Sequence, residues 1–270
     1  MSHSASFVTP RLPPLLGIAI GVAAISTASI FIRLAQTAGA PSLAIAALRL
    51  VFASLVLLPF AWWRCRAELM TLSARDLWVC LLSGTFLGAH FATWITSLQY
   101  TSVTSSVVLV TLSPLFVALT SALFLKERLP RLAMAGVVIA VLGGITLSLG
   151  DAGQATQDAP NPLLGNALAF AGALCIVPHF LIGRRLRARL SLLAYISLVY
   201  SAAGVVLLVA VLVTRTPLGG FDPQAYLWMA LLALLPQLVG HTSFNWSLGF
   251  LPAAFATIPA LGEPIGSTIL

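Results

Sequence analysis

Two charged residues, Arg49 and Glu263, lie inside apolar stretches long enough to cross a membrane. A charge at the centre of a bilayer costs on the order of 2.5 to 3.5 kcal/mol, so such residues usually face a partner or a polar cavity. Helical rise places Glu263 about 13 Å and Arg49 about 12 Å from the same edge of a ~30 Å apolar core. These depths predict a charge pair or coupling site, in which Glu263 binds a proton or an amine and Arg49 can clamp a carboxylate. A structural ion pair is the alternative.

A polar stripe follows the apolar stretch 225–246. Gln237, His241 and Asn245 recur every four residues and therefore share one face of an α-helix. The stretch 77–97 carries a comparable set: His90, Trp94 and Ser97. Polar faces at this depth are predicted to line a substrate pathway, with interhelical hydrogen bonds, worth ~0.6 kcal/mol each, as the alternative.

Prolines interrupt two further apolar stretches at corresponding places. Pro114 and Pro264 each remove a backbone donor and free a carbonyl near the middle of a span. Interrupted helices at equivalent places in two halves of a chain indicate a transporter binding site. We therefore place both prolines on the substrate pathway, with a simple packing kink as the alternative.

The sequence contains no motif for a metal, a cofactor or a catalytic nucleophile. H-E-x-x-H, P-loop and nucleophile-elbow patterns are absent, and the three cysteines are scattered, so neither a metal nor a disulfide framework is indicated. An intramembrane enzyme would need a nucleophile and a base, or paired carboxylates, at one depth. Glu263 is a single acid, and helix counting puts His90 nearer the outer face and His241 nearer the inner face.

Composition sets the fold class. Hydrophobic residues make up 59% of the 270 residues and charged residues only 8%, against roughly 25% charged in a soluble domain. An all-α polytopic membrane protein is therefore expected, without the alternation of a β-barrel. Nine helices are expected to span the bilayer, near residues 14–32, 42–62, 77–97, 102–124, 132–150, 162–183, 192–213, 225–246 and 252–270.

Basic residues predict the orientation. With a cytoplasmic N-terminus, eleven of the fourteen Lys and Arg residues fall on the inner side, as the positive-inside rule requires. The net charge of +7 is explained by these loops, so nucleic acid is not an expected partner. We expect an integral protein of the bacterial inner (plasma) membrane.

An internal repeat divides the chain. The sequence of residues 84–128 is repeated, with lower similarity, 150 positions later. This repeat indicates two units, at 13–150 and 162–270. Because the first unit holds five spans, an odd number, the second enters the membrane inverted. The second unit shows four spans, so we expect one further helix to complete it, the sequence being truncated before this tenth helix.

Particular stretches are similar to a known family. IAALRLVFASLVLLPF, SLQYTSVTSSVVLVTLSPLFVALTSALFLKERL and PAAFATIPALGEPIGSTIL resemble the EamA-type transporters of the drug/metabolite transporter superfamily. The resemblance implies ten helices in two inverted repeats of five, cytoplasmic termini and transport of small metabolites.

These observations favour a secondary-active transporter, working as an exporter of small metabolites such as amino acids by alternating access between the two repeats. Its expected partners are a small-molecule substrate and the lipid bilayer, with proton coupling possible through Glu263. A non-transporting helical scaffold is the alternative, and an intramembrane enzyme a weaker one. The sequence carries no signal for an oligomeric state.

Overall fold

The computed structural model describes residues 13–127, 131–151, 155–157 and 159–270. Every regular element in these residues is a helix, which confirms the predicted all-α class. In chain order the elements are α1 (Pro14–Ile25), α2 (Ala28–Thr37), α3 (Ser42–Met70), α4 (Ala74–Ser97), α5 (Val103–Val110), α6 (Ser113–Phe124), α7 (Arg131–Asp151), α8 (Pro162–Arg187), α9 (Leu192–Thr214), α10 (Pro223–Leu232), η1 (Ala233–His241), α11 (Thr242–Ser247), α12 (Ala253–Thr257), η2 (Ile258–Gly262) and α13 (Glu263–Ile269).

Seven helical segments within the described residues are long and apolar enough to cross a membrane: Pro14–Thr37, Ser42–Met70, Ala74–Ser97, Val103–Phe124, Pro162–Arg187, Leu192–Thr214 and Pro223–Ser247. They correspond to seven of the nine predicted spans. The fifth predicted span is the 21-residue helix α7. The ninth differs from a single long helix, because it is divided into the short helices α12, η2 and α13.

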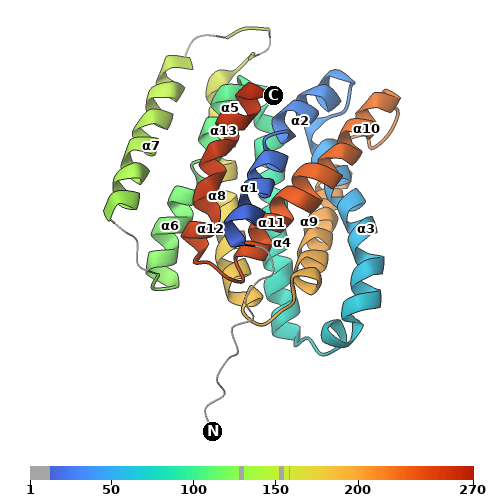
Figure 1. Cartoon of the computed structure of the whole chain (residues 1–270). Coiled ribbons are helices and arrows are strands. Elements are labelled where there is room, and N and C mark those ends of the chain that lie inside the picture. Colours follow the sequence, from blue (N-terminus) through green and yellow to red (C-terminus); the bar gives the residue numbers. More distant parts are fainter. Residues whose placement is uncertain (1–12, 128–130, 152–154, 158) are drawn as a thin grey trace.

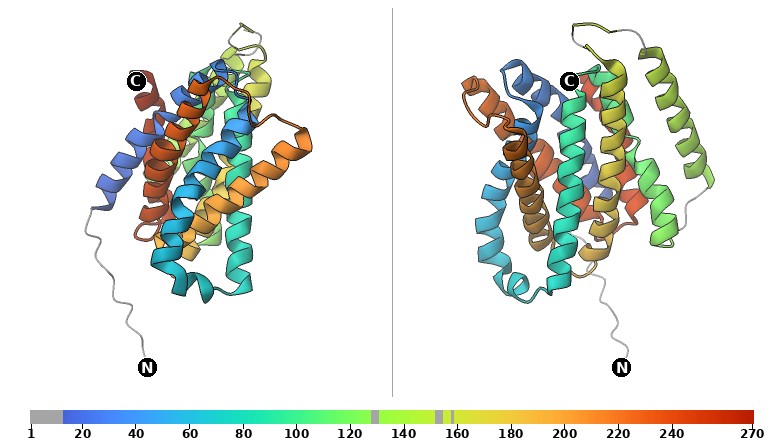
Figure 2. Two further views of the ribbon diagram at one scale, coloured as in Figure 1. Left: turned by 90° about the vertical axis from the view of Figure 1, so that its right-hand side faces the viewer. Right: turned by 180° about the vertical axis from the view of Figure 1, so that it is seen from behind.

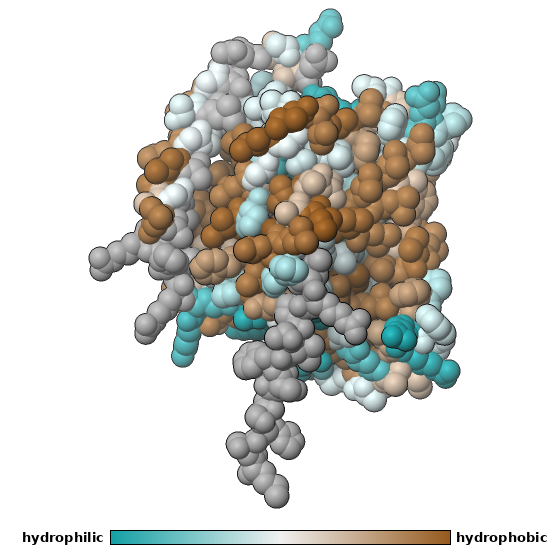
Figure 3. Space-filling model, viewed as in Figure 1, coloured by the Kyte–Doolittle hydropathy of each residue, from teal (hydrophilic) through white to brown (hydrophobic). Residues whose placement is uncertain are grey.

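The face of the molecule shown in Figure 3 is apolar over most of its height. Large side chains such as Leu55, Phe60, Leu123 and Val213 are more than half exposed. A water-soluble protein does not present so much contiguous apolar surface, whereas a bilayer requires it. The chain is therefore an integral, polytopic membrane protein.

The bundle has a tightly packed back layer and a front group of shorter helices (Figures 1 and 2). In the back layer α4 packs against α8 and α9, and α3 packs against α9. In front, α1 packs against η1 and α11, and α12 packs against α6. The shorter helices thus lie in front of the long ones.

Helix α7 lies at one edge of the bundle, where it contacts α5 and α8 (Figure 1). This span carries no ionisable residue between its ends, and the sequence predicts it outside the functional centre. None of its described residues lines the central cavity, in agreement with that prediction.

Close contact between α4 and α9 depends on glycine. A Cβ on Gly84 would lie 2.6 Å from the Ala202 Cβ and 2.7 Å from the Val199 carbonyl oxygen. Backbone cannot move aside as a flexible side chain can, so only glycine fits here. The small residue lets the two helix backbones approach closely, as is common in membrane bundles.

We predict that Gly84→Ala lowers the stability of the bundle by about 1–3 kcal/mol, because the added methyl group must push α9 away. The measurement is thermal unfolding of the purified protein in detergent. The matched control is Gly136→Ala in α7, where an added Cβ meets nothing within 4 Å. Equal stability of the two variants would contradict the packing described here.

Candidate functional site

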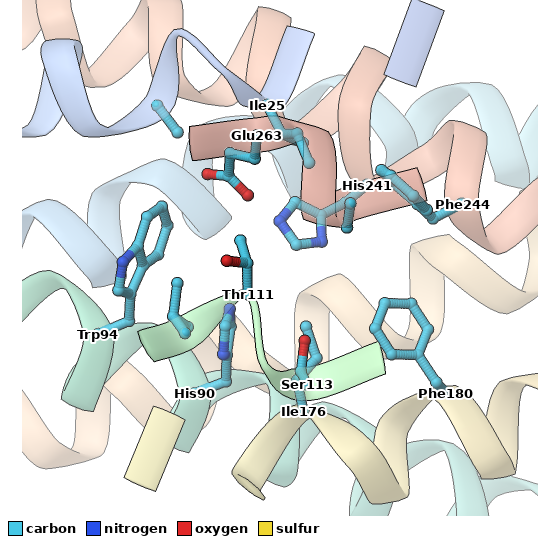
Figure 4. A pocket seen from close by; sticks show the side chains of 13 residues that line it. Ile25, His90, Trp94, Thr111, Ser113, Ile176, Phe180, His241, Phe244 and Glu263 are labelled. Carbon is cyan, nitrogen blue, oxygen red and sulfur yellow. The ribbon is translucent and has the colours of Figure 1, made fainter. Parts of the chain in front are cut away.

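A cavity lies at the centre of the bundle, between the front helices and the back layer (Figure 4). Its apolar wall includes Ile25, Ile176, Phe180 and Phe244. The polar side chains that line it are His90, Trp94, Thr111, Ser113, His241 and Glu263. In the close-up, Glu263 and His241 enter from one side and His90 from the opposite side.

Helix breaks bring several of these polar groups to the cavity. Thr111 and Leu112 separate α5 from α6, and Pro114 stands in the first turn of α6, where a missing N–H costs least. The lining residues Thr111 and Ser113 flank this break. Pro264 likewise stands in the first turn of α13, directly after Glu263. Both predicted interruptions are therefore present, although neither proline itself lines the cavity.

His90 is held in a fixed orientation by α8 and by neighbouring rings. Its Nδ1 lies 2.9 Å from the Gly172 carbonyl oxygen and donates to it. Its ring stacks on Trp94, with centroids 5.9 Å apart. This arrangement leaves the other ring nitrogen, Nε2, as the acceptor in the neutral form.

The prediction that His90 and His241 lie at different depths was wrong. Their ring centroids are 6.3 Å apart, and both rings contact Phe91. Helix counting measures path length, whereas α10, η1 and α11 run obliquely across the bundle (Figure 1). The tilt carries His241 to the level of His90, so two imidazoles share one cavity.

Glu263 is 7% exposed and faces the cavity (Figure 4). Its carboxylate has no hydrogen bond or ion pair with any described residue, and the ion pairs found in this part of the chain are Arg184–Glu127 and Arg189–Asp76. Arg49 and Glu263 lie near enough for their charges to interact, without a direct contact. The predicted salt bridge is thus not formed in this conformation, and pairing in another stays a prediction.

Arg49 is fully buried behind the cavity wall. Its Nε donates to Gln237 Oε1 at 3.0 Å, and its guanidinium lies over the Phe91 ring, 4.0 Å from the centroid. Phe91 also touches both cavity histidines. The Phe91 ring therefore contacts the guanidinium on the one hand and two residues of the cavity wall on the other.

Of the polar stripe, His241 lines the cavity, whereas Gln237 and Asn245 lie behind it. Gln237 holds Arg49, and Asn245 Nδ2 donates to the Tyr200 hydroxyl at 3.2 Å. The prediction of one polar face assumed α-helical spacing. Ala233–His241 is instead a π-helix, which has more residues per turn than an α-helix. The signal for this was Pro236, which cannot donate within the helix.

A second buried polar cluster was not expected from the sequence. Ser83 Oγ lies 2.9 Å from His179 Nδ1 and 3.0 Å from the Tyr195 hydroxyl. All three side chains are fully buried and none lines the cavity. The cluster therefore ties α4, α8 and α9 together by hydrogen bonds.

The cavity is small in this conformation. Its volume is about 50 Å³, and one water molecule needs ~10–15 Å³ of such volume. This volume has room for a few water molecules, and a larger solute does not fit unless the cavity widens.

One end of the bundle is rich in arginine and is tied by directed contacts. Glu127 Oε1 accepts from Arg184 Nε at 3.2 Å, and its Oε2 accepts from the Ala253 backbone N–H at 3.0 Å. Arg184 also donates to the Leu248 carbonyl at 2.9 Å. We call Glu127, Arg184, Leu248 and Ala253 the end clamp, because it joins the ends of α6, α8 and α11 to the start of α12.

Comparisons with known proteins agree with this architecture. A model described as the EamA-like transporter family matches residues 12–149. The "Uncharacterized transporter YetK" of Bacillus subtilis (strain 168) is 29% identical over 151 residues, which cover 54% of this chain and 44% of that relative. A solved crystal structure aligns with a TM-score of 0.66 and 21% identity, over 94% of this chain and 86% of its own, a likeness of fold.

We predict that Arg49→Ala destabilises the protein by about 2–4 kcal/mol, because it opens a void and leaves Gln237 without its partner. Glu263→Gln should change stability by less than about 1 kcal/mol, since the carboxylate makes no direct contact that is lost. Thermal unfolding in one detergent compares the two variants. A larger loss for Glu263→Gln would show that Glu263 has a structural partner.

Proposed function

The chain belongs to the EamA-like transporter family, and on this premise we propose that it is a secondary-active exporter of small metabolites such as amino acids. The central cavity is the observation that carries the proposal. It combines polar groups with an apolar wall, which suits a small molecule that has both kinds of surface.

We propose that residues 13–150 and 162–270 are two inverted repeats that rock against each other around the cavity. Residues of both units line it: His90, Trp94 and Thr111 come from the first, and His241 and Glu263 from the second. A site at the interface of two units opens to either side when one unit tilts. This supports alternating access.

The end clamp is the proposed closure of one side. Glu127 precedes the fifth span of the first unit, whereas Arg184, Leu248 and Ala253 belong to the second. Opening the cavity toward this end requires these contacts to break. We assign this end to the cytoplasm of a bacterial cell, with a cytoplasmic N-terminus, because its arginines obey the positive-inside rule.

Glu263 is the proposed coupling residue, binding either a proton or a substrate amine in turn. It is a carboxylate on the cavity surface without an ion-pair partner among the residues that the structure describes, so a change in its charge disrupts no ion pair seen there. His90 and His241 are the rival titrating groups, and Trp94 offers an aromatic face to an apolar or cationic part of the substrate. Pro114 and Pro264 position the helix breaks.

A non-transporting scaffold is the second candidate. It is favoured by Gln237 and Asn245, whose hydrogen bonds go to neighbouring helices and not into the cavity. A scaffold moves no solute across sealed vesicles, whereas a transporter does. Flux measurements therefore separate the two candidates.

We predict that Glu263→Gln abolishes the response of solute flux to an imposed pH gradient while solute exchange continues. Glutamine keeps the shape of the protonated acid but cannot change charge. The measurement uses proteoliposomes with and without a gradient, and His90→Gln and His241→Gln are tested separately. Unchanged pH dependence in an active Glu263→Gln protein would exclude the carboxylate as the coupling group.

We predict that Glu127→Gln speeds labelling of a cavity cysteine from the arginine-rich end, because the end clamp loses its charged member. The test places Ser113→Cys in a chain whose Cys65, Cys80 and Cys175 are replaced, and adds an impermeant thiol reagent to vesicles of known sidedness. A several-fold faster reaction is expected.

The matched control for this labelling is Asp76→Asn. It removes the ion pair with Arg189 at the same end, 2.5 Å in length, which does not involve α11 or α12. This control should leave the labelling rate unchanged. Equal rates in Glu127→Gln and the unmodified background would show that the clamp does not hold this end closed.

A further inference from the structure

The guanidinium of Arg49 presents hydrogen-bond donors that nothing in the described chain accepts. Nη1 and Nη2 are buried without a partner, and so is Nε2 of Gln237, the residue that binds Arg49 through Nε. Donors therefore gather here around a buried positive charge. Buried donors and charges normally have partners, because leaving them unpaired is costly.

The missing complement is an anionic acceptor. Arg49 interacts with the charge of Glu263, but Glu263 faces the cavity and makes no direct contact with it. The planar fork of two guanidinium nitrogens matches the two oxygens of a carboxylate. The amide Nε2 of Gln237 adds a neutral donor beside that fork.

Phe91 contacts both the Arg49 guanidinium and the two histidines that line the cavity. Its ring carries the Arg49 guanidinium 4.0 Å from its centroid, and it lies 4.9 Å from the His90 ring and 5.1 Å from the His241 ring. Movement of this ring, together with the histidines packed against it, is what a connection between the donors and the cavity requires. Widening of the cavity for a metabolite makes room for that movement.

We propose, on the premise that the cavity is the substrate path, that Arg49 and Gln237 form a subsite for a carboxylate group of the substrate. Phe91 covers this subsite in the present conformation. Glu263 acts as the internal competitor, because its negative charge opposes a second anion nearby. The substrate thus carries a carboxylate. When this group binds, it replaces Glu263 as the negative charge nearest to Arg49.

Three probes of similar shape test the subsite: benzoate, benzamide and benzylamine. Binding to the purified protein in lipid nanodiscs is measured by calorimetry at pH 7.5, where benzoate is an anion and benzylamine a cation. Benzoate should bind about tenfold more tightly than neutral benzamide, which has nearly the same shape. Glu263→Gln should strengthen benzoate binding about threefold and weaken benzylamine binding, effects of opposite sign that a purely structural change would not give.

Two variants address the subsite itself. Arg49→Lys keeps the charge but loses the planar fork of donors. Gln237→Glu places a carboxylate of the same size beside Arg49. This second variant should fold even if Arg49→Lys does not. Each should weaken benzoate binding about tenfold. Arg66→Gln, on the exposed end of α3, is the matched control and should change nothing.

Benzoate that binds no more tightly than benzamide overturns the carboxylate subsite, whatever benzylamine does. Benzoate affinity unchanged in Gln237→Glu also overturns it. If the carboxylate subsite is overturned but benzylamine binding still depends on Glu263, the proposed function is not contradicted. Loss of all solute flux in vesicles, with benzoate still bound at Arg49, would instead remove the proposed function and keep the subsite.

Discussion

The cost of placing charge inside an apolar bundle governs this structure. Arg49 is fully buried among helices whose outer surface faces lipid, so its guanidinium must be stabilised by the few polar and aromatic groups within reach. Gln237 of η1 and Phe91 of α4 supply that support, and they thereby fix how α3 packs against these two elements. Tyr200, Asn245 and the two cavity histidines are further polar side chains buried inside the bundle, and Asn245 donates to the Tyr200 hydroxyl.

Helix interruptions give the cavity its polar surface. A continuous helix satisfies its own backbone and offers lipid-like side chains, whereas the breaks before Pro114 and Pro264 expose Thr111, Ser113 and Glu263. The π-helix at Ala233–His241 turns His241 to the cavity and Gln237 toward Arg49. The breaks in the front helices thus lie where the backbone faces protein or cavity, and the long helices α3, α4, α8 and α9 form the back layer.

The sequence predicted the helical class, seven of the spans and both proline interruptions, because hydropathy and missing donors act locally. It also singled out His90, Trp94, His241 and Glu263, which the cavity brings together. It failed where geometry is non-local: helix tilt set the depth of His241, and a change of helix type moved Gln237 and Asn245. Phe91 was missed because an apolar residue in an apolar span gives no signal, and Glu127 because only the basic residues of the loops were used, to predict the orientation.

Solute flux through the cavity is the most direct test that this cavity is the transport path. Proteoliposomes loaded with a cell metabolite extract are compared by mass spectrometry with protein-free vesicles, before and after a bulky thiol reagent modifies Ala260→Cys, a cavity position, in the background lacking the native cysteines. Our account predicts faster loss of a subset of solutes that stops on modification. Flux that persists unchanged after modification, or no flux above that of protein-free vesicles, would contradict it.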